Sequence, residues 1–380
     1  MKKICIFGII DSIWTLKCVE KPRLWEKANI TMYGLNGTAY RDWYLEHGVS
    51  LVNPKLQGPL YHIPKVRGAV SCLRYMTGSA ALCRKQGPFD VIHVSFLSIP
   101  KLMLLPLFRR YCGKLVCTFW GSDLMRERPV LLRLFRRALA QADIITLSTE
   151  EMERRFLEVF GDGFRDKLRR IRFGVEGLDA LAALNCSRDE VRRQLQLPSD
   201  KLVVAIGYNG HECQNHLRVL QVISELPVTC REKLFLQFPL TYGLTPGYRT
   251  QLLSAIEKTG CPYQLIETFQ NLDALARLRM STDLFIHAQQ TDAFSASVQE
   301  YLYAEKPVLN PAWIAYPDLV KNGVYYMEYR DFEDLREKLL SILNHGISSA
   351  DHEKLHANRE KLEKLSSWRS VAKDWEALYL

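Results

Sequence analysis

The chain has 380 residues, of which 47% are hydrophobic, so it is long and apolar enough for two domains with separate cores. Its net charge of +9 is uneven, since residues 1–185 carry 29 Lys and Arg against 17 Asp and Glu, while the rest carries 22 against 25. The ten cysteines include no C-x-x-C pair and no regular framework, which argues against a zinc site and favours free thiols in a reducing cytosol.

The first residues, MKKICIFGII, predict a β-strand rather than a signal peptide. Their apolar run stops at Asp11, and no small-residue cleavage site follows it. The longest apolar stretch, residues 91–108, is interrupted by a histidine, a lysine and two prolines, which argues against a membrane span. We therefore expect a protein that is soluble or held peripherally at a membrane.

Residues 1–173 alternate between strand-like and helix-like patterns, and we expect them to form the first domain. Helical periodicity is clearest at residues 129–141 and 150–160. Apolar runs that predict strands lie at residues 3–9, 29–35, 89–96, 114–121, 142–148 and 167–175. This alternation predicts a doubly wound parallel sheet, with a domain boundary near Gly174.

Basic residues in this half cluster beside large apolar ones, as in PLFRRY, LLRLFRRAL and MERRFLEVF. The pattern is typical of amphipathic basic helices on anionic membrane surfaces, although ordinary solvated helix faces would look the same. The charge asymmetry favours the membrane interpretation. A nucleic acid partner is not expected, because no DNA- or RNA-binding motif accompanies the basic residues.

The second domain, predicted for residues 174–350, opens with an apolar strand, a glycine-containing loop and a helix. The strand is LVVAIG, the loop is YNGHECQN and the helix is HLRVLQVI. Such a turn directs backbone N–H groups at a phosphate, so Asn209, Gly210 and His211 are candidate ligand-binding residues. A second strand, LFLQFPLTYG, ends at Tyr242, which is either a cleft residue or an ordinary loop aromatic.

Residues 283–317 form the most informative stretch, with an expected order of strand, loop, helix and strand. In parallel α/β sheets ligands bind beyond the carboxyl ends of the strands, where the QQTD loop lies. Asp292 and Glu300 are eight positions apart, and Ser295 and Ser297 lie between them at the expected helix N-terminus. Carboxylates suit sugar hydroxyls and exposed N–H groups suit phosphates, which together favour a nucleotide sugar. The alternative is that Asp292 caps the helix and Glu300 is solvated.

The last segment, residues 351–380, carries large apolar residues at helical spacing. Its aromatic content favours a helix that docks on the protein rather than a free tail. The spaced residues are Trp368, Val371, Trp375, Leu378 and Tyr379.

These stretches together resemble GT-B glycosyltransferases, particularly the retaining family four. The unit from Asp292 to Glu300, followed by KPV, is similar to the acidic-x7-Glu motif of that family. DVIHVS, TFWGSD and IRFGVE resemble segments of the amino-terminal domain and of the crossover between domains. The YNGHECQN turn is similar to that of bacterial Fuc4NAc transferase-type enzymes. The sequence departs from family four at Asp292, at Trp120, and in the loop where the family has Arg and Lys.

The resemblance implies an α/β fold of the GT-B type, with two Rossmann-like doubly wound domains facing across a cleft. The donor would bind the second domain, the acceptor the first, and the helix at residues 351–380 would return to the first domain. Glu300 would hold the ribose hydroxyls, and Asp292 and Ser295 would approach the sugar or phosphate. Asn209 to His211, with the helix start at Ser297, would face the diphosphate.

The implied activity is transfer of a sugar from a nucleoside-diphosphate sugar to a hydroxyl acceptor, such as a lipid-linked glycan or surface polysaccharide precursor. We expect a retaining, metal-independent enzyme without a cofactor, located in the cytoplasm or on the inner face of the membrane. If the reaction instead inverts configuration, His93 and Asp123 are candidate bases, and Gly121 shapes the turn beside them.

Two other functions remain open on the sequence. A nucleotide-sugar epimerase would use the same donor pocket, and a non-catalytic module would bind a sugar or partner transferases. The missing Arg and Lys and the presence of Trp120 keep the second of these open. A Rossmann dehydrogenase is disfavoured because the opening unit lacks a G-x-G-x-x-G motif.

Overall fold

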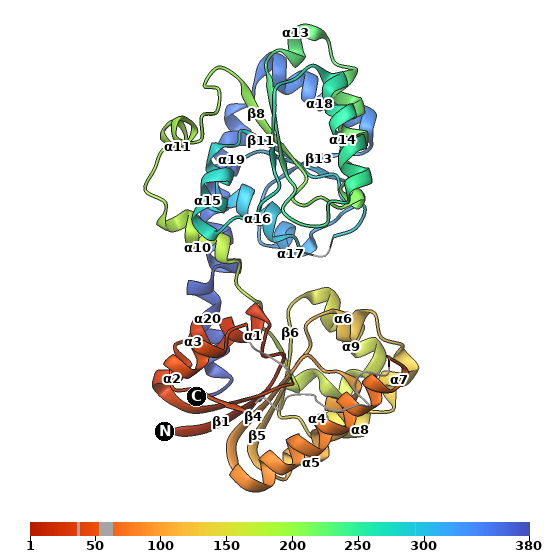
Figure 1. Cartoon of the computed structure of the whole chain (residues 1–380), viewed down its shortest axis with the longest axis vertical. Coiled ribbons are helices and arrows are strands. Elements are labelled where there is room, and N and C mark those ends of the chain that lie inside the picture. Colours follow the sequence, from red (N-terminus) through yellow and green to blue (C-terminus); the bar gives the residue numbers. More distant parts are fainter. Residues whose placement is uncertain (36–38, 53–63, 293) are drawn as a thin grey trace. The chain divides into compact units, whose positions relative to one another are not determined.

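The computed structural model describes residues 1–35, 39–52, 64–292 and 294–380. It divides into two compact units, of which the first comprises Met1–Gly174 with Val371–Leu380, and the second comprises Val175–Ser370. Each unit is built on one parallel sheet (Figure 1).

The sheet of the first unit has seven strands in the order β3-β2-β1-β4-β5-β6-β7. The strands are β1 (Lys2–Phe7), β2 (Ala28–Tyr33), β3 (Ser50–Val52), β4 (Phe89–Ser95), β5 (Cys112–Thr118), β6 (Ile144–Leu147) and β7 (Leu168–Arg170). The helices are α1 (Ile13–Glu20), α2 (Leu24–Lys27), α3 (Arg41–Glu46), α4 (Pro64–Gln86), α5 (Ile99–Arg109), α6 (Ser122–Met125), α7 (Pro129–Arg133), α8 (Arg136–Leu139) and α9 (Glu150–Phe160), with the 3-10 helix η2 (Asp162–Lys167). The six predicted strands are present, whereas the short edge strand β3 was not predicted.

The sheet of the second unit has six strands in the order β10-β9-β8-β11-β12-β13. The strands are β8 (Leu202–Ile206), β9 (Leu234–Pro239), β10 (Tyr263–Ile266), β11 (Leu284–Ile286), β12 (Val308–Pro311) and β13 (Met327–Tyr329). The helices are α10 (Glu176–Ala183), α11 (Arg188–Gln194), α12 (His216–Ser224), α13 (Val228–Arg231), α14 (Pro246–Thr259), α15 (Leu272–Ser281), α16 (Ala296–Tyr303), α17 (Pro317–Lys321), α18 (Phe332–His345) and α19 (Ser349–Ser366), with the 3-10 helix η3 (Glu212–Gln214). The last helix, α20 (Trp368–Ala377), begins in this unit and continues into the first.

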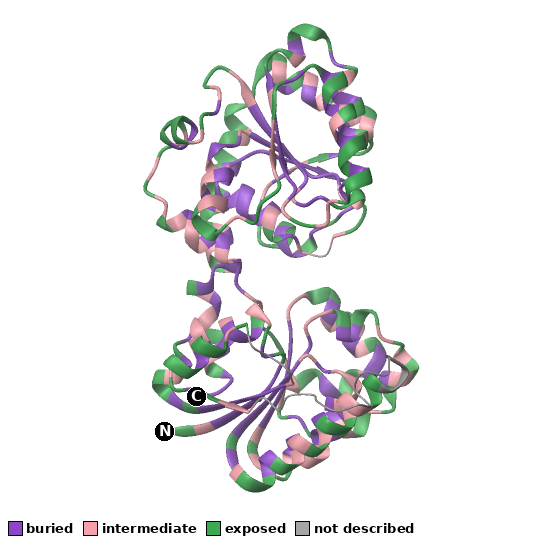
Figure 2. Cartoon of the chain, in the orientation of Figure 1, coloured by how far each residue is buried: buried purple, intermediate pink, exposed green. Residues whose placement is uncertain are grey.

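Both faces of the second sheet are buried, which explains why its strands read as continuous apolar runs. Val204 and Ile206 of β8 face one hydrophobic cluster, and Ala205 between them faces the other. Figure 2 shows the same pattern, with buried strands inside each unit and exposed residues on the outer sides of the helices. The doubly wound α/β architecture predicted from the sequence is therefore confirmed.

The carboxy-terminal segment is shared between the units. Helix α19 belongs to the second unit, while Val371–Leu380 belongs to the first. Within the first unit, Trp375 donates from its indole N–H to the Arg172 carbonyl at 2.8 Å. The ammonium of Lys2 donates to the carbonyls of Tyr379 at 3.2 Å and Leu380 at 2.9 Å. Across the described ranges, no helix has the length and apolar character needed to cross a membrane.

Candidate functional site

The candidate site of the second unit lies at the carboxyl ends of its central strands. Ile206 at the end of β8 pairs with Ile286 at the end of β11, so the loops that begin at Gly207 and His287 leave the sheet at the same level. Gly207 has φ +66°, and its N–H donates to the Ile286 carbonyl at 3.1 Å. A Cβ at this position would lie 2.6 Å from Nε2 of His216, so space and conformation both require glycine.

The Asp292 carboxylate is the centre of this site. Its Oδ2 accepts a hydrogen bond from the Tyr208 hydroxyl at 2.9 Å and lies 3.4 Å from Nε2 of His287. Its side chain is only 10% exposed. Burial raises the pKa of Tyr208 and of Tyr316, and the nearby Asp292 charge raises both further. Both phenols therefore stay neutral near pH 7 and offer O–H donors to the carboxylate side of the site.

His287 lies between two aromatic rings and has a defined tautomer. Its ring stacks with Tyr208 at 5.9 Å and with Tyr316 at 6.3 Å between centroids. Its Nδ1 lies 2.8 Å from Oδ1 of Asn310, whose own amide donates to the carbonyls of Pro311 and Ile314. Since that amide oxygen can only accept, Nδ1 of His287 carries the proton. The other ring nitrogen of His287, Nε2, faces the Asp292 carboxylate.

A pair of glutamines fixes Tyr208. The amide of Gln214 donates to Oε1 of Gln289 at 2.6 Å, and the amide of Gln289 donates to the Tyr208 hydroxyl. The Tyr208 N–H donates to Oε1 of Gln214 at 3.3 Å. Gln289 is itself fixed because its carbonyl accepts from the Trp313 indole at 2.9 Å. The hydroxyl beside Asp292 is therefore held in place by side chains from two loops.

Sequence reasoning missed most of this cluster. Tyr208, Gln214, His287, Gln289 and Tyr316 were not predicted as site residues. The only available signal was their position, since His287 lies near the end of a predicted strand and the others follow one or lie in the QQTD loop. Their mutual contacts span about 80 positions of the chain and leave no local pattern.

Ser295 and Ser297 lie at the start of α16, as predicted. The Ser295 hydroxyl accepts from the Val298 N–H at 3.3 Å and is the N-cap of the helix. The alternative that Asp292 caps this helix is therefore wrong. The Ser297 hydroxyl accepts from Nη2 of Arg279 at 3.2 Å.

Glu300 is buried and paired, so the alternative of a solvated helix residue is also wrong. Its carboxylate accepts from Nε of Arg279 at 3.0 Å, and both side chains are almost fully buried. Arg279 also donates from Nη1 to the Tyr301 hydroxyl at 2.8 Å. A Cβ on Gly177, at the start of α10, would overlap the Glu300 carboxylate. Glu300 is therefore paired with Arg279 and packs against Gly177. Its role in binding ribose stays a prediction.

The predicted phosphate loop is ordered by contacts with the loop after β9. Oδ1 of Asn209 accepts from the His211 N–H at 2.9 Å, and its amide lies 3.3 Å from the Tyr242 hydroxyl. The Gly210 N–H donates to the Tyr242 carbonyl at 2.7 Å. The exposed His211 ring lies over Gly243, where a Cβ would be 2.5 Å from the ring. The structure thus brings Asn209, Gly210, His211 and Tyr242 together.

Two other residues of this region are engaged elsewhere. His216 is fully buried beside the Tyr248 hydroxyl at 3.1 Å, and burial lowers the pKa of His216 to about 4. The Arg218 guanidinium lies 4.4 Å from the centroid of the Phe332 ring. His211 is therefore the predicted residue of this loop whose side chain is exposed and lies beside Tyr242.

His93, in the first unit, is a buried residue with both ring nitrogens engaged. Nδ1 lies 2.7 Å from the Tyr379 hydroxyl, and Nε2 lies 2.7 Å from the Thr118 hydroxyl. Burial lowers the pKa of His93 to about 3, with a smaller contribution from Lys101. These contacts do not support the predicted role as a base, because the ring has no nitrogen left for a substrate.

Asp123 and Gly121 shape the loop after β5. The Asp123 carboxylate accepts from the N–H groups of Leu97, Trp120 and Gly121 at 2.8, 2.9 and 2.9 Å. Burial raises the pKa of Asp123, while these N–H groups favour its charged form. Gly121 has φ +133°, which requires glycine. The geometry assigns Asp123 to loop order and does not support it as a base.

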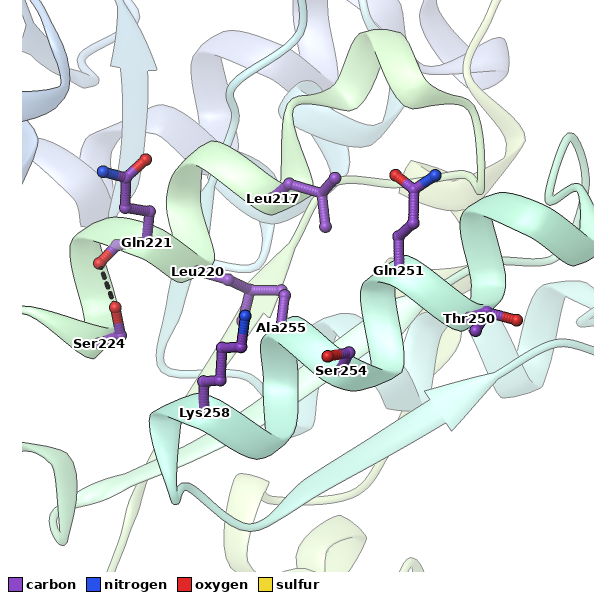
Figure 3. Close-up of a pocket in the computed structure, with 9 residues that line it drawn as sticks. All are labelled: Leu217, Leu220, Gln221, Ser224, Thr250, Gln251, Ser254, Ala255 and Lys258. Atoms are coloured by element: carbon purple, nitrogen blue, oxygen red, sulfur yellow. Dashed lines mark hydrogen bonds between the residues drawn. The ribbon is translucent and has the colours of Figure 1, made fainter.

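Other features of the second unit lie away from this cluster. A groove of about 550 Å³ runs between α12 and α14 and is lined by polar and aliphatic side chains of both helices (Figure 3). None of the predicted site residues lines this groove. Among the residues that the structure describes, no group of three or more His, Cys, Asp or Glu is arranged to hold a metal ion.

Searches against protein-family models and curated proteins find no match to this chain. Solved structures do match over its whole length. A glycosyltransferase from Rickettsia africae superposes with a TM-score of 0.72 at 14% identity, covering 100% of this chain and 98% of the other. Anabaena HepE in complex with UDP has a TM-score of 0.69 at 12% identity, covering 99% and 98%.

A third match is WaaG, a glycosyltransferase involved in lipopolysaccharide biosynthesis. It superposes with a TM-score of 0.62 at 13% identity, covering 99% of each chain. Identities this low establish the fold alone, and the predicted two-domain α/β fold of the GT-B type is confirmed. The similarity to Fuc4NAc transferase-type enzymes stays a prediction.

Proposed function

We propose that this chain is a glycosyltransferase that moves a sugar from a nucleoside-diphosphate sugar to a hydroxyl acceptor. The observation that carries the proposal is the Asp292 carboxylate, held by Tyr208 at the carboxyl edge of the second sheet of a GT-B fold. Structures of the similar Anabaena HepE contain UDP and UDP-glucose, which supports a nucleotide-sugar donor.

Asp292 is proposed to contact the donor sugar. A carboxylate oxygen accepts hydrogen bonds from hydroxyl groups, as Oδ2 of Asp292 does from Tyr208, and a sugar hydroxyl is the donor proposed for it beside His287. His211 and the N–H groups at the start of α16 would stabilise charge as the diphosphate leaves, which is often the largest catalytic contribution. The sequence contains no DxD-type motif, so a metal-independent reaction without a cofactor is part of this proposal.

Turnover of nucleotide sugars tests this function. We expect the purified chain to release a nucleoside diphosphate from one of UDP-glucose, UDP-N-acetylglucosamine, GDP-mannose or dTDP-glucose. Asp292→Asn should lower kcat by about 100-fold or more, a scale typical of a lost electrostatic group, while the melting temperature changes little. Release by Asp292→Asn at the wild-type rate would refute the role of Asp292.

The finer proposal is a retaining enzyme that acts on a lipid-linked glycan or polysaccharide precursor at the inner face of the membrane. Val130 and Leu134 in the α7–α8 segment are each 72% exposed, and Arg128, Arg133 and Arg137 are exposed beside them. Exposed aliphatic groups among arginines suit an anionic lipid surface. Arg133 and Arg136 also donate to the carbonyls of Val159 and Phe160, so they are poor choices for mutation.

Vesicle binding tests this surface. The double variant Val130→Asp, Leu134→Asp should lose most of its cosedimentation with vesicles of phosphatidylglycerol and phosphatidylcholine. Val228→Asp, which changes a residue that is 58% exposed on the second unit, is the matched control and should bind like wild type. Equal cosedimentation of the double variant and wild type would contradict the membrane surface.

A non-catalytic GT-B module is the second candidate, and specific observations favour it. Oε2 of Glu300 accepts from Arg279, and His216 is buried beside Tyr248, so neither is open to a diphosphate sugar as they stand. Such a module would bind a nucleotide or sugar without turnover. Binding in the absence of any nucleotide release from the four donors, with or without added acceptors, would favour this alternative.

A further inference from the structure

The first unit contains a cavity of about 370 Å³ at the carboxyl edge of its sheet. The loop that follows β1 contributes Gly8, Ile9 and Ile10, and Phe96 follows the end of β4. Tyr75 of α4 and Lys101 of α5 also line the cavity. The size is within the range of small-molecule sites, and most of the wall is apolar.

Lys101 places a cation in this apolar wall. Its residue is only 4% exposed, and its Nζ donates to the Ser95 carbonyl at 2.6 Å. The same Nζ lies 5.9 Å from the centroids of the Tyr75 and Phe96 rings. An ammonium has three N–H donors, and within the described ranges the Ser95 carbonyl is the one acceptor found for them.

No carboxylate neutralises this ammonium by direct contact in the described part of the chain. Asp123 attracts Lys101 at longer range, but its oxygens accept from the N–H groups of Leu97, Trp120 and Gly121. Burial lowers the pKa of Lys101 to about 7, which reflects the cost of leaving this charge in an apolar setting. A buried cation with spare donors beside a cavity is the arrangement expected for an anionic ligand.

We propose that this cavity binds a molecule in which an anionic group is joined to an apolar group, with the anion on Lys101 and the apolar part against Ile9, Ile10 and Phe96. Combined with the proposed function, on which this assignment rests, the ligand is the acceptor. The anion is a phosphate on a lipid or a carboxylate on a sugar with an apolar aglycone. The common requirement is one negative charge next to hydrocarbon.

Calorimetric titration of the full chain with small probes tests the proposal. The probes are geranyl monophosphate, phenyl β-glucuronide, geraniol and inorganic phosphate. We expect one of the two amphiphilic anions to bind at least about tenfold more tightly than geraniol or phosphate, because a charge-assisted hydrogen bond adds to apolar contact. The tighter of the two anions identifies the phosphate or the carboxylate as the source.

Lys101→Met keeps the length of the side chain and removes its charge. It should weaken the binding of the anion by about tenfold or more and leave the affinity for geraniol unchanged. Lys85→Met, an exposed lysine of α4, is the matched control and should bind like wild type. Cys72 lines the cavity, so its alkylation by N-ethylmaleimide measures occupancy of the cavity in the wild-type protein. A bound anion should slow this alkylation.

Two results would overturn the proposal. One is equal binding of geraniol and both anions, and the other is anion binding that neither depends on Lys101 nor protects Cys72. Nucleotide release in the absence of acceptor separates the two assignments. If nucleotide is released but neither anion binds, the assignment of the cavity is refuted and the transferase proposal stands. If an anion binds but no nucleotide does, the transferase proposal is refuted and the anion site in the cavity stands.

Discussion

At the scale of single residues, the two carboxylates that suggested a nucleotide-sugar site have different surroundings. Asp292 faces hydroxyl and imidazole groups, while Glu300 is enclosed with a guanidinium. Their spacing of eight residues is visible in the sequence, but the residues that contact them could not be predicted from it. Tyr208 and Arg279 come from other segments, and only the folded chain brings them beside the pair.

Arg279→Met should destabilise the second unit strongly. The change leaves Glu300 as a buried carboxylate without its partner, which typically costs about 3–5 kcal/mol of unfolding free energy. Urea unfolding followed by circular dichroism measures the loss.

Arg277→Met is the matched control for this prediction. It lies on the same helix, and its pair with Asp273 at 2.8 Å is exposed, so it should lose far less stability. Similar losses in the two variants would mean that the Glu300–Arg279 pair is not buried as described.

Lys101 should make stability depend on pH. Its pKa is lowered to about 7 in the folded chain from an ordinary 10.5. Between these values the unfolded chain keeps a proton that the folded chain has released, so rising pH stabilises the fold through this group. From pH 7 to pH 9 the unfolding free energy of wild type should gain up to about 2 kcal/mol relative to Lys101→Met.

Chemical unfolding at several pH values checks this trend. Lys85→Met should follow wild type, because it leaves Lys101 in place. If the difference in unfolding free energy between wild type and Lys101→Met stayed constant from pH 7 to pH 9, the burial of a titrating ammonium would be contradicted.

At the scale of elements, the strands were the most predictable part of the fold. Long apolar runs such as those of β4 and β8 are typical of buried strands, whereas the three-residue strand β3 leaves too short a pattern. The helix predicted at residues 129–141 is two short helices, α7 and α8. The register of β8, β11 and β12, which sets His287 beside Asn310, depends on pairing that the sequence does not display.

Gly177→Ala tests the contact between the start of α10 and α16. The added Cβ would overlap the Glu300 carboxylate, so the variant should lose about 1–3 kcal/mol of unfolding free energy through overpacking. Gly247→Ala, at the start of α14, has open space around the new Cβ and should be neutral or slightly stabilising. Thermal unfolding of both variants decides, and a neutral Gly177→Ala would contradict this contact.

At the scale of the whole molecule, the sequence was sufficient to predict two doubly wound sheets. Of residues 351–380, which were expected to dock on the first domain, Val371–Leu380 belong to the first unit. That segment is recognisable because Trp375 and Tyr379 repeat at helical spacing and are too apolar for a free tail. The role of His93 was not predictable, since the Tyr379 hydroxyl that engages its ring lies 286 positions away.

The most direct test of the account is a thermal-shift panel of UDP, GDP, ADP and dTDP. A ligand that binds only the folded chain raises its melting temperature. We predict that one nucleotide raises the melting temperature of wild type and raises it less in His211→Ala. The exposed His352 of α19 provides the control variant His352→Ala, which should respond like wild type. If none of the four nucleotides shifts the melting temperature, the proposed donor site is contradicted.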